Sequence, residues 1–262
     1  MQEADIEKQA EAEQRPNLID LWEDRDGKST IAAFLQAAAL VMKRNGRLAD
    51  HLDLPLDYSS AKRFRWAALA PVFVVIALAL LPWFAILAGK FIWPEMEVLA
   101  DPPTWALIVL PVVTVVMVLL LWGLWTGMVS WFFDSRKLKP WRRHRAIALS
   151  YYLSAPLALL AIPMGIAAYI ATQLMTDAFS DGPPGSYPVE LGGAASTLFI
   201  CVMVYWLQMI VFAARDVIGR RVPGLVATAV VLPILWVLTA VLVLLLPVGV
   251  MMWVFMYYSL AV

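Results

Sequence analysis

Residues 105–133 read WALIVLPVVTVVMVLLLWGLWTGMVSWFF, a run of 29 residues without one charged side chain. A helix needs about 20 apolar residues to cross the ~30 Å hydrocarbon core of a bilayer, so this run is long enough to span a membrane. Four further charge-free runs cover residues 66–89, 146–174, 191–214 and 222–262. The five runs predict an all-α fold, a polytopic transmembrane helical bundle.

The composition agrees with that class. Hydrophobic residues make up 62% of the 262 positions and charged residues 15%, whereas a soluble domain is about 45–50% apolar and about 25% charged. The mean hydropathy is +0.75. The formal net charge is zero, so no global field points to a nucleic-acid partner.

The last run is ambiguous, because its 41 residues are too many for a single crossing. One interpretation is a fifth span over residues 222–246, followed by an apolar, aromatic C-terminal tail at the far interface. The other is a hairpin at Pro247 that adds a sixth span and returns the C-terminus. Only 15 residues follow Pro247, which is short for a crossing, so we favour five spans.

Basic residues alternate between the segments that join the runs. Residues 62–65, 134–145 and 215–221 carry three, six and three Lys or Arg, whereas residues 90–104 carry one and residues 175–190 carry none. Loops rich in Lys and Arg stay on the cytoplasmic side, so this pattern places the N-terminus in the cytoplasm. The chain begins with acidic residues rather than the basic and apolar stretches of a cleaved signal peptide. We expect an integral protein of the bacterial cytoplasmic membrane.

Residues 1–65 form a polar N-terminal region that we expect in the cytoplasm. Within it, residues 30–44 predict a short amphipathic helix, which Ser29 or Thr30 can cap. The apolar part, residues 31–42, is too short to span a membrane. The helix either lies on the inner leaflet, with its basic end against anionic lipid, or packs on the basic cytoplasmic loops.

The runs contain no Asp, Glu, Lys, Arg or His. Proton relays and ion-coupled transporters usually place such groups within the membrane, so the sequence argues against machinery of that kind. A single cysteine, Cys201, and two histidines outside the runs, His51 and His144, provide neither a disulfide nor a metal cluster. We therefore predict no catalytic residue, no metal and no cofactor. The hydroxyl groups in the runs are expected to bond to their own backbone or to a neighbouring helix.

Small residues mark two runs as packing surfaces. Gly123 and Gly127 form a GxxxG pair in the second run, and Ser150 and Ser154 form a similar stripe in the third. Small side chains four residues apart let two helices approach closely. Since a short loop joins these two helices, our first interpretation is that they pack on each other. Homodimerisation through the glycines is the alternative.

The densest cluster of charge lies in residues 134–145. A tryptophan beside arginines suits the headgroup region of a membrane, where the ring lies at the interface and the arginines contact phosphates. The segment either serves topology alone or docks an acidic lipid or a partner protein. The residues concerned are Arg136, Lys137, Lys139, Trp141, Arg142, Arg143 and Arg145.

The sequence ALSYYLSAPL at residues 148–157 resembles the start of the third span in bacterial members of the Yip family. Those proteins are similar to the Ypt/Rab-interacting membrane proteins, in which a cytoplasmic N-terminal region precedes five helices. The resemblance implies an organising or trafficking-type membrane protein without known catalysis, and it transfers no functional residue to this chain. Pro156 in the same segment predicts a kink.

These patterns together predict a non-enzymatic integral membrane protein, acting as a scaffold, a trafficking-type organiser or an accessory subunit of a membrane complex. Its expected partners are anionic membrane lipids and proteins of such a complex. The alternative is a transporter or channel component, in which polar helix faces would converge near Gln173 or Gln208. A membrane enzyme would need acid–base groups at an interface, where His144 and Asp134 are among the few candidates.

Overall fold

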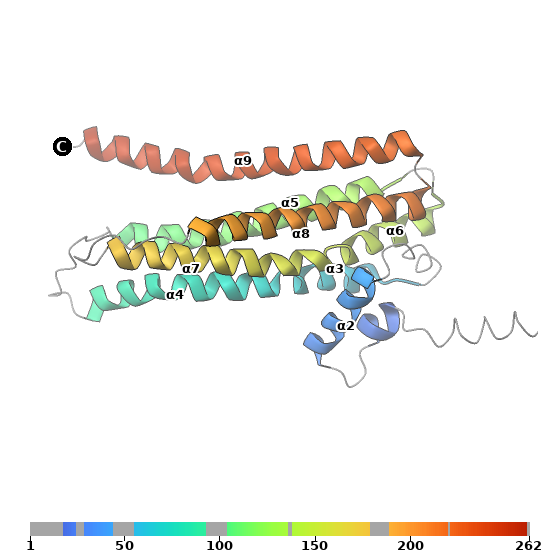
Figure 1. The fold of residues 1–262 in the computed structure, drawn as a ribbon, viewed down its shortest axis with the longest axis horizontal. Helices are drawn as coiled ribbons and strands as arrows, with labels where there is room; N and C mark the ends of the chain where they lie inside the picture. Colours follow the sequence, from blue (N-terminus) through green and yellow to red (C-terminus); the bar gives the residue numbers. More distant parts are fainter. Residues whose placement is uncertain are drawn as a thin grey trace, which may run out of the picture.

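The protein is described from a computed structural model, and all regular structure in the described residues is helical. Five helices are long and apolar enough to cross a membrane, which confirms the predicted all-α bundle of five spans and marks the chain as a membrane protein. The long helices lie side by side along one axis (Figure 1). The residues that the structure describes are 18–24, 29–43, 55–92, 104–135, 138–178, 189–219 and 221–260.

The first span consists of two helices. Helix α3 covers Tyr58–Ala67 and helix α4 covers Ala70–Ile92, with a turn at Ala68 and Leu69 between them. Pro71 lacks the N–H that would continue the helical ladder across this turn, which explains the interruption. Helix therefore begins eight residues before the predicted span, inside the segment that carries the first basic residues.

The third span is broken in the same way. Helix α6 covers Pro140–Tyr152, the 3₁₀ helix η3 covers Ala155–Leu160, and helix α7 covers Ala161–Ala178. The break lies at Pro156, where the sequence predicted a kink. Since α6 begins at Pro140, much of the predicted basic loop is the first turn and a half of a helix.

The other three spans are single helices: α5 over Thr104–Phe133, α8 over Val189–Ile218 and α9 over Val222–Leu260. Helix α9 continues through Pro247 without a turn, so the sixth-span hairpin is wrong. The helix runs on past the expected end of the fifth span near residue 246, so the expected apolar tail is helical as far as Leu260. Gly219, with φ +64°, makes the left-handed turn between α8 and α9.

The break in the third span changes its neighbours. Helix α6 packs on α3 and α5, whereas α7 packs on α4 and α8; α9 packs on α5 and α8. Among the described residues, α5 packs closely on neither η3 nor α7, and it packs on α4 directly.

The N-terminal segments pack against one end of this bundle. The π-helical turn η1 covers Ile19–Glu23 and helix α2 covers Thr30–Lys43. Ser29 caps α2, since its hydroxyl accepts the Ala32 N–H at 3.2 Å. The apolar face of α2 packs on η1 and η3. The sequence offered packing on the basic cytoplasmic loops as one alternative, and the neighbours of α2 are helical segments instead. Its outer side leaves Ile31 and Leu35 exposed by 73% and 60%.

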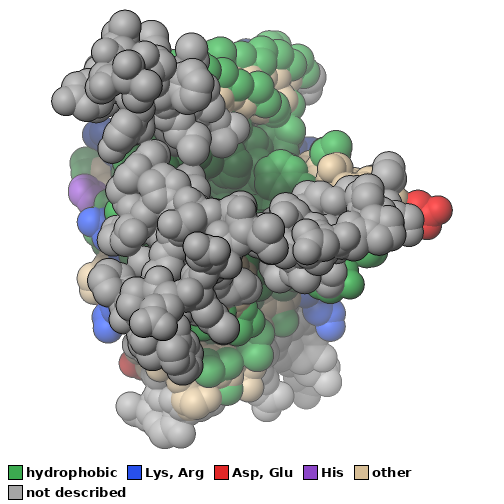
Figure 2. Space-filling view, turned by 90° about the vertical axis from the view of Figure 1, so that its left-hand side faces the viewer, with side chains coloured by type: hydrophobic (Ala, Val, Ile, Leu, Met, Phe, Trp, Pro, Cys, Tyr) green, Lys and Arg blue, Asp and Glu red, His purple; other side chains and the backbone are tan. Residues whose placement is uncertain are grey.

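Charged residues are concentrated in the sequence where α3 and α6 begin and α8 turns into α9. These helix ends lie on the right of Figure 1. We call this the polar end. Figure 2 views the bundle from the opposite end, where most of the described side chains are hydrophobic and basic side chains appear at the margins. Exposed cations of the polar end are Lys62, Arg63, Lys139, Arg142, Arg215 and Arg221.

Candidate functional site at the polar end

An aromatic cluster attaches the N-terminal segment to the bundle. The buried Trp22 indole N–H donates to the Ser60 carbonyl at 2.8 Å. Its ring meets Phe34 of α2 and Phe64 of α3 edge-on, with centroids 6.4 and 5.3 Å away. Phe64 in turn lies against Tyr152 of α6 at 4.9 Å. Edge-to-face pairs of this kind add to the energy of burial, so one cluster connects η1, α2, α3 and α6.

The carboxylate of Glu23 reinforces this cluster. It accepts the Tyr152 hydroxyl at 2.8 Å and the Asp57 backbone N–H at 3.1 Å. Burial raises the pKa of Glu23, and the two hydrogen bonds oppose that rise. Near the C-terminal end of α2, the Tyr205 hydroxyl of α8 donates to the Met42 carbonyl at 3.0 Å. We call the contacts of Trp22 and Glu23 the N-terminal latch.

Asp57 caps α3 beside this latch. Its carboxylate accepts the backbone N–H groups of Ser59 and Ser60 at 3.1 and 2.9 Å and the Ser59 hydroxyl at 2.6 Å. The hydrogen bond from the Ser59 hydroxyl, followed by that from the Ser60 N–H, lowers the pKa of Asp57 to about 2.

Replacing Asp57 with alanine is expected to lower the free energy of unfolding by about 1 kcal/mol, the usual cost of losing an N-cap. Because the folded-state pKa lies below the ordinary 3.8, the contribution is present above pH 4 and is lost as the pH falls toward 2. Thermal unfolding in detergent from pH 2 to 7 measures both effects.

The matched control for this experiment is Asp57→Asn, which can still cap but does not titrate. It should keep most of the stability at neutral pH and lose less stability than wild type as the pH falls toward 2. Glu23, whose pKa is raised, contributes with the opposite sign, so the variants are compared with each other at each pH. An unchanged acid dependence in Asp57→Ala would contradict the assignment.

A row of cations and aromatic rings follows the latch along α3. Lys62 Nζ lies 4.6 Å from the Tyr58 ring centroid. The Arg65 guanidinium carbon lies 5.0 Å from the Trp66 ring and 4.7 Å from the Tyr151 ring of α6. The Tyr58 and Tyr151 hydroxyls are 3.1 Å apart. We call these five residues the cation–aromatic row.

The predicted basic segment forms a second aromatic cluster at the start of α6. The guanidinium groups of Arg142 and Arg145 lie 5.3 and 4.8 Å from the ring of Trp141, which is itself exposed. Lys139 is exposed one residue before the helix. The structure thus brings four of the predicted contact residues together. Two others, Arg136 and Lys137, lie outside the described residues.

Arg143 has a different role from its neighbours. Its guanidinium forms a two-point ion pair with Asp134 at the end of α5, with Nη2 donating to Oδ2 at 2.8 Å. His144 Nδ1 lies 2.8 Å from the Pro140 carbonyl of its own helix. The two interfacial candidates for acid–base chemistry, Asp134 and His144, therefore have separate partners.

The small residues predicted to pack helices behave in two ways. Ser150 and Ser154 are buried, and each hydroxyl donates to the carbonyl three residues earlier at 2.6 Å. A Cβ added at Gly123 or Gly127 would meet no atom of the described chain within 4 Å. Helices α5 and α6 do pack on each other, but the glycines leave open space instead of forming that contact. Homodimerisation through them stays a prediction.

The polar groups expected of a transport path do not converge in the described residues. Gln208 is exposed on α8, and the side chain of Gln173 lies outside the description. The hydroxyls of Thr126, Thr228 and Thr239 donate to carbonyls of their own helices. The described residues also contain no group of three His, Cys, Asp or Glu placed to hold a metal ion.

Sequence reasoning missed the latch and the cation–aromatic row. The latch joins residues up to 129 positions apart, and no local pattern predicts such a pairing. The row had a readable signal, since Tyr58, Lys62 and Trp66 recur at four-residue spacing on one helix face.

Comparisons with known proteins identify no relative: no family model, no curated protein and no solved structure matches this chain. Function must therefore be argued from the polar end itself.

Proposed function

We propose that this protein is a non-enzymatic scaffold or accessory subunit of a membrane complex, which presents its polar end to partner proteins. The observation that carries the proposal is the N-terminal latch. Through Trp22 and Glu23 it holds η1 and α2 on α3 and α6, and Tyr205 connects α2 to α8. Segments from three parts of the chain thereby form one platform, as a docking surface requires.

The exposed cluster around Trp141 supports this interpretation. Trp and Arg are enriched among the residues that dominate protein interfaces, and both also suit a membrane surface that carries anionic lipid. Trp141 and Arg142 are exposed at the start of α6, where a partner can reach them. A trafficking-type organiser, as the likeness to the Yip family implies, would use such a surface.

The proposed orientation places the polar end in the cytoplasm of a bacterial cell, with the N-terminus on the same side. It rests on the excess of Lys and Arg in the segments that reach this end. A transporter or channel component remains the alternative class, but no contact among the described residues favours it.

The test is purification of the full chain in mild detergent, followed by identification of the proteins that co-purify in fixed proportion. We expect the double variant Trp141→Ala/Arg142→Glu to lose the partner by about tenfold or more, since hot-spot residues each cost above 1–2 kcal/mol. The matched control, Arg215→Glu, changes an exposed cation elsewhere at the polar end and should retain the partner.

The same comparison in sealed vesicles tests the orientation. A soluble partner should bind inverted vesicles, which expose the cytoplasmic face, and not right-side-out vesicles. Purification of a clean monomer that carries a bound small solute would overturn the scaffold proposal and favour transport.

A further inference from the structure

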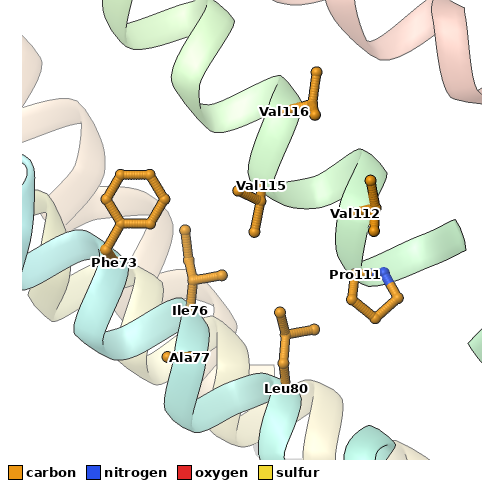
Figure 3. A pocket seen from close by; sticks show the side chains of 8 residues that line it. All are labelled: Phe73, Ile76, Ala77, Leu80, Pro111, Val112, Val115 and Val116. Atoms are coloured by element: carbon orange, nitrogen blue, oxygen red, sulfur yellow. The ribbon is translucent and has the colours of Figure 1, made fainter. Parts of the chain in front are cut away.

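The side of the bundle below the cation–aromatic row contains a cavity. It has a volume of about 370 Å³ and lies between α4 and α5. Figure 3 shows Phe73, Ile76 and Leu80 of α4 pointing toward α5, where Pro111 and Val115 face them. The lining is apolar throughout, so the cavity suits a hydrocarbon chain rather than a polar solute.

The row and the cavity lie on one continuous face of the first span. Tyr58, Lys62, Trp66, Phe73 and Leu80 recur at intervals of four or seven residues, which keeps them on the same side of a helix. The turn at Ala68 and Leu69 interrupts this face only briefly. A molecule in the cavity can therefore extend toward Lys62 along one side of the protein.

Helix α5 provides the opposite wall. Val116, which lines the cavity, is followed at seven-residue intervals by Gly123 and Ser130. Gly123 leaves open space beside its backbone, and Ser130 is a hydrogen-bonding neighbour of Tyr151 in the row. Open space beside Gly123 therefore lies on α5 between the depth of the cavity and the depth of the row.

The cation–aromatic row carries two cations, Lys62 and Arg65. Among the described residues, neither Lys62 nor Arg65 forms an ion pair with a carboxylate. The Arg65 Nε–H is buried and has no hydrogen-bond partner in the described chain. Two cations beside the hydroxyls of Tyr58 and Tyr151 favour an anion that accepts hydrogen bonds, such as a phosphate.

The length of the site matches one leaflet of a membrane. Arg65 and Leu80 are fifteen residues apart, about 22 Å at 1.5 Å per residue. A bilayer is about 40–45 Å thick with its headgroups, so one leaflet measures about 20–22 Å. A lipid with its phosphate at Arg65 would place the end of its acyl chain near Leu80.

We propose that this side of the bundle binds one glycerophospholipid with a net negative headgroup. Its phosphate lies at Lys62 and Arg65, and one acyl chain occupies the cavity between α4 and α5. The site is separate from the surface around Trp141, and its existence does not depend on the scaffold function.

Native mass spectrometry of the full chain, purified with either phosphatidylglycerol or phosphatidylcholine added, tests the proposal. We expect one retained phosphatidylglycerol per chain and retention of phosphatidylcholine lower by about tenfold, because two cations attract a net negative headgroup and the choline cation cancels the charge of the phosphate. Dihexanoyl phosphatidylglycerol, which has the same headgroup and short chains, should be washed off because it cannot fill the cavity.

Two matched pairs of variants assign the two halves of the site. Lys62→Gln/Arg65→Gln should lose phosphatidylglycerol by about tenfold, whereas Arg63→Gln, an exposed cation on the same helix, should keep it. Val116→Trp should block the cavity, whereas Val241→Trp should not; both valines are 47% exposed. If the double variant does not fold, Lys62→Gln alone, at an exposed position, should lower phosphatidylglycerol retention several-fold.

Equal retention of the two lipids would overturn the proposal, because the headgroup would then not be recognised. Identical retention by Lys62→Gln/Arg65→Gln and Arg63→Gln would overturn the phosphate position. Unchanged binding in Val116→Trp would remove the acyl chain from the cavity.

Discussion

Replacing Trp206 with alanine is expected to lower the free energy of unfolding by about 3 kcal/mol, at the lower end of the range for truncating a buried aromatic side chain. Trp206 of α8 is 1% exposed and stacks on Trp236 of α9, with centroids 4.4 Å apart and planes 3° from parallel. Trp125 of α5 donates its indole N–H to the Trp236 carbonyl at 3.3 Å and to the Thr239 hydroxyl at 3.1 Å. The stack therefore joins α9 to the two helices on which it packs.

The measurement is thermal or SDS-induced unfolding of the purified protein, with two comparison variants. Trp206→Phe keeps an aromatic ring and removes an indole N–H that has no partner in the described chain, so it should cost only about 1 kcal/mol. Trp131→Ala truncates a tryptophan that is 70% exposed and should change stability little. If Trp206→Ala is as stable to heat or SDS as Trp131→Ala, the stack does not hold α9.

The sequence predicted a span best where the boundary of the charge-free run coincides with the end of the helix. The run at residues 105–133 agrees with α5 over Thr104–Phe133 within one residue. Helix α3, however, begins at Tyr58 and helix α6 at Pro140, before the first charge-free residue of each run. Lys and Arg are good helix formers, so a charged segment can extend a spanning helix into water. A charge-free run measures compatibility with hydrocarbon and not the length of a helix.

The helix N-caps can be predicted from the local sequence, whereas the contacts of the N-terminal latch cannot. Ser29 begins α2 as expected, and the sequence Asp57-Tyr58-Ser59-Ser60 carries an N-cap residue before α3. By contrast, the contact of Glu23 with Tyr152 depends on how α3, α6 and η1 meet in space. Nothing in the neighbourhood of Tyr152 distinguishes it from Tyr151, although the two hydroxyls face different partners.

The lengths of the helices explain why a platform forms at the polar end. Helices α5 and α8 each contain 30 residues, about 45 Å at 1.5 Å per residue, which exceeds the ~30 Å hydrocarbon core. The excess must extend into a headgroup layer or beyond. Both helices pack on α6, which begins at the polar end, so the helices that extend beyond the membrane there have a protein neighbour.

Replacing Trp22 with alanine is expected to release η1 and α2 from the rest of the platform and to leave the spanning bundle folded. The substitution removes the hydrogen bond to the Ser60 carbonyl and the edge contacts with Phe34 and Phe64. A loss of about 3 kcal/mol corresponds to about a 100-fold increase in the opening equilibrium. Limited trypsin digestion measures that opening, because cleavage of a transiently open segment follows its population. Cleavage within residues 1–57 should accelerate strongly.

Two comparisons show what this variant would establish. Trp131→Ala, with an exposed tryptophan at the end of α5, should be cleaved at the wild-type rate, and equal rates for the two variants would mean that Trp22 does not hold the N-terminal segment. Partner retention in detergent then shows whether binding needs the whole platform or only the cluster around Trp141. If the platform carries the scaffold function, Trp22→Ala should lose the partner although Trp141 and Arg142 are intact. Retention despite rapid cleavage would restrict the docking surface to α6.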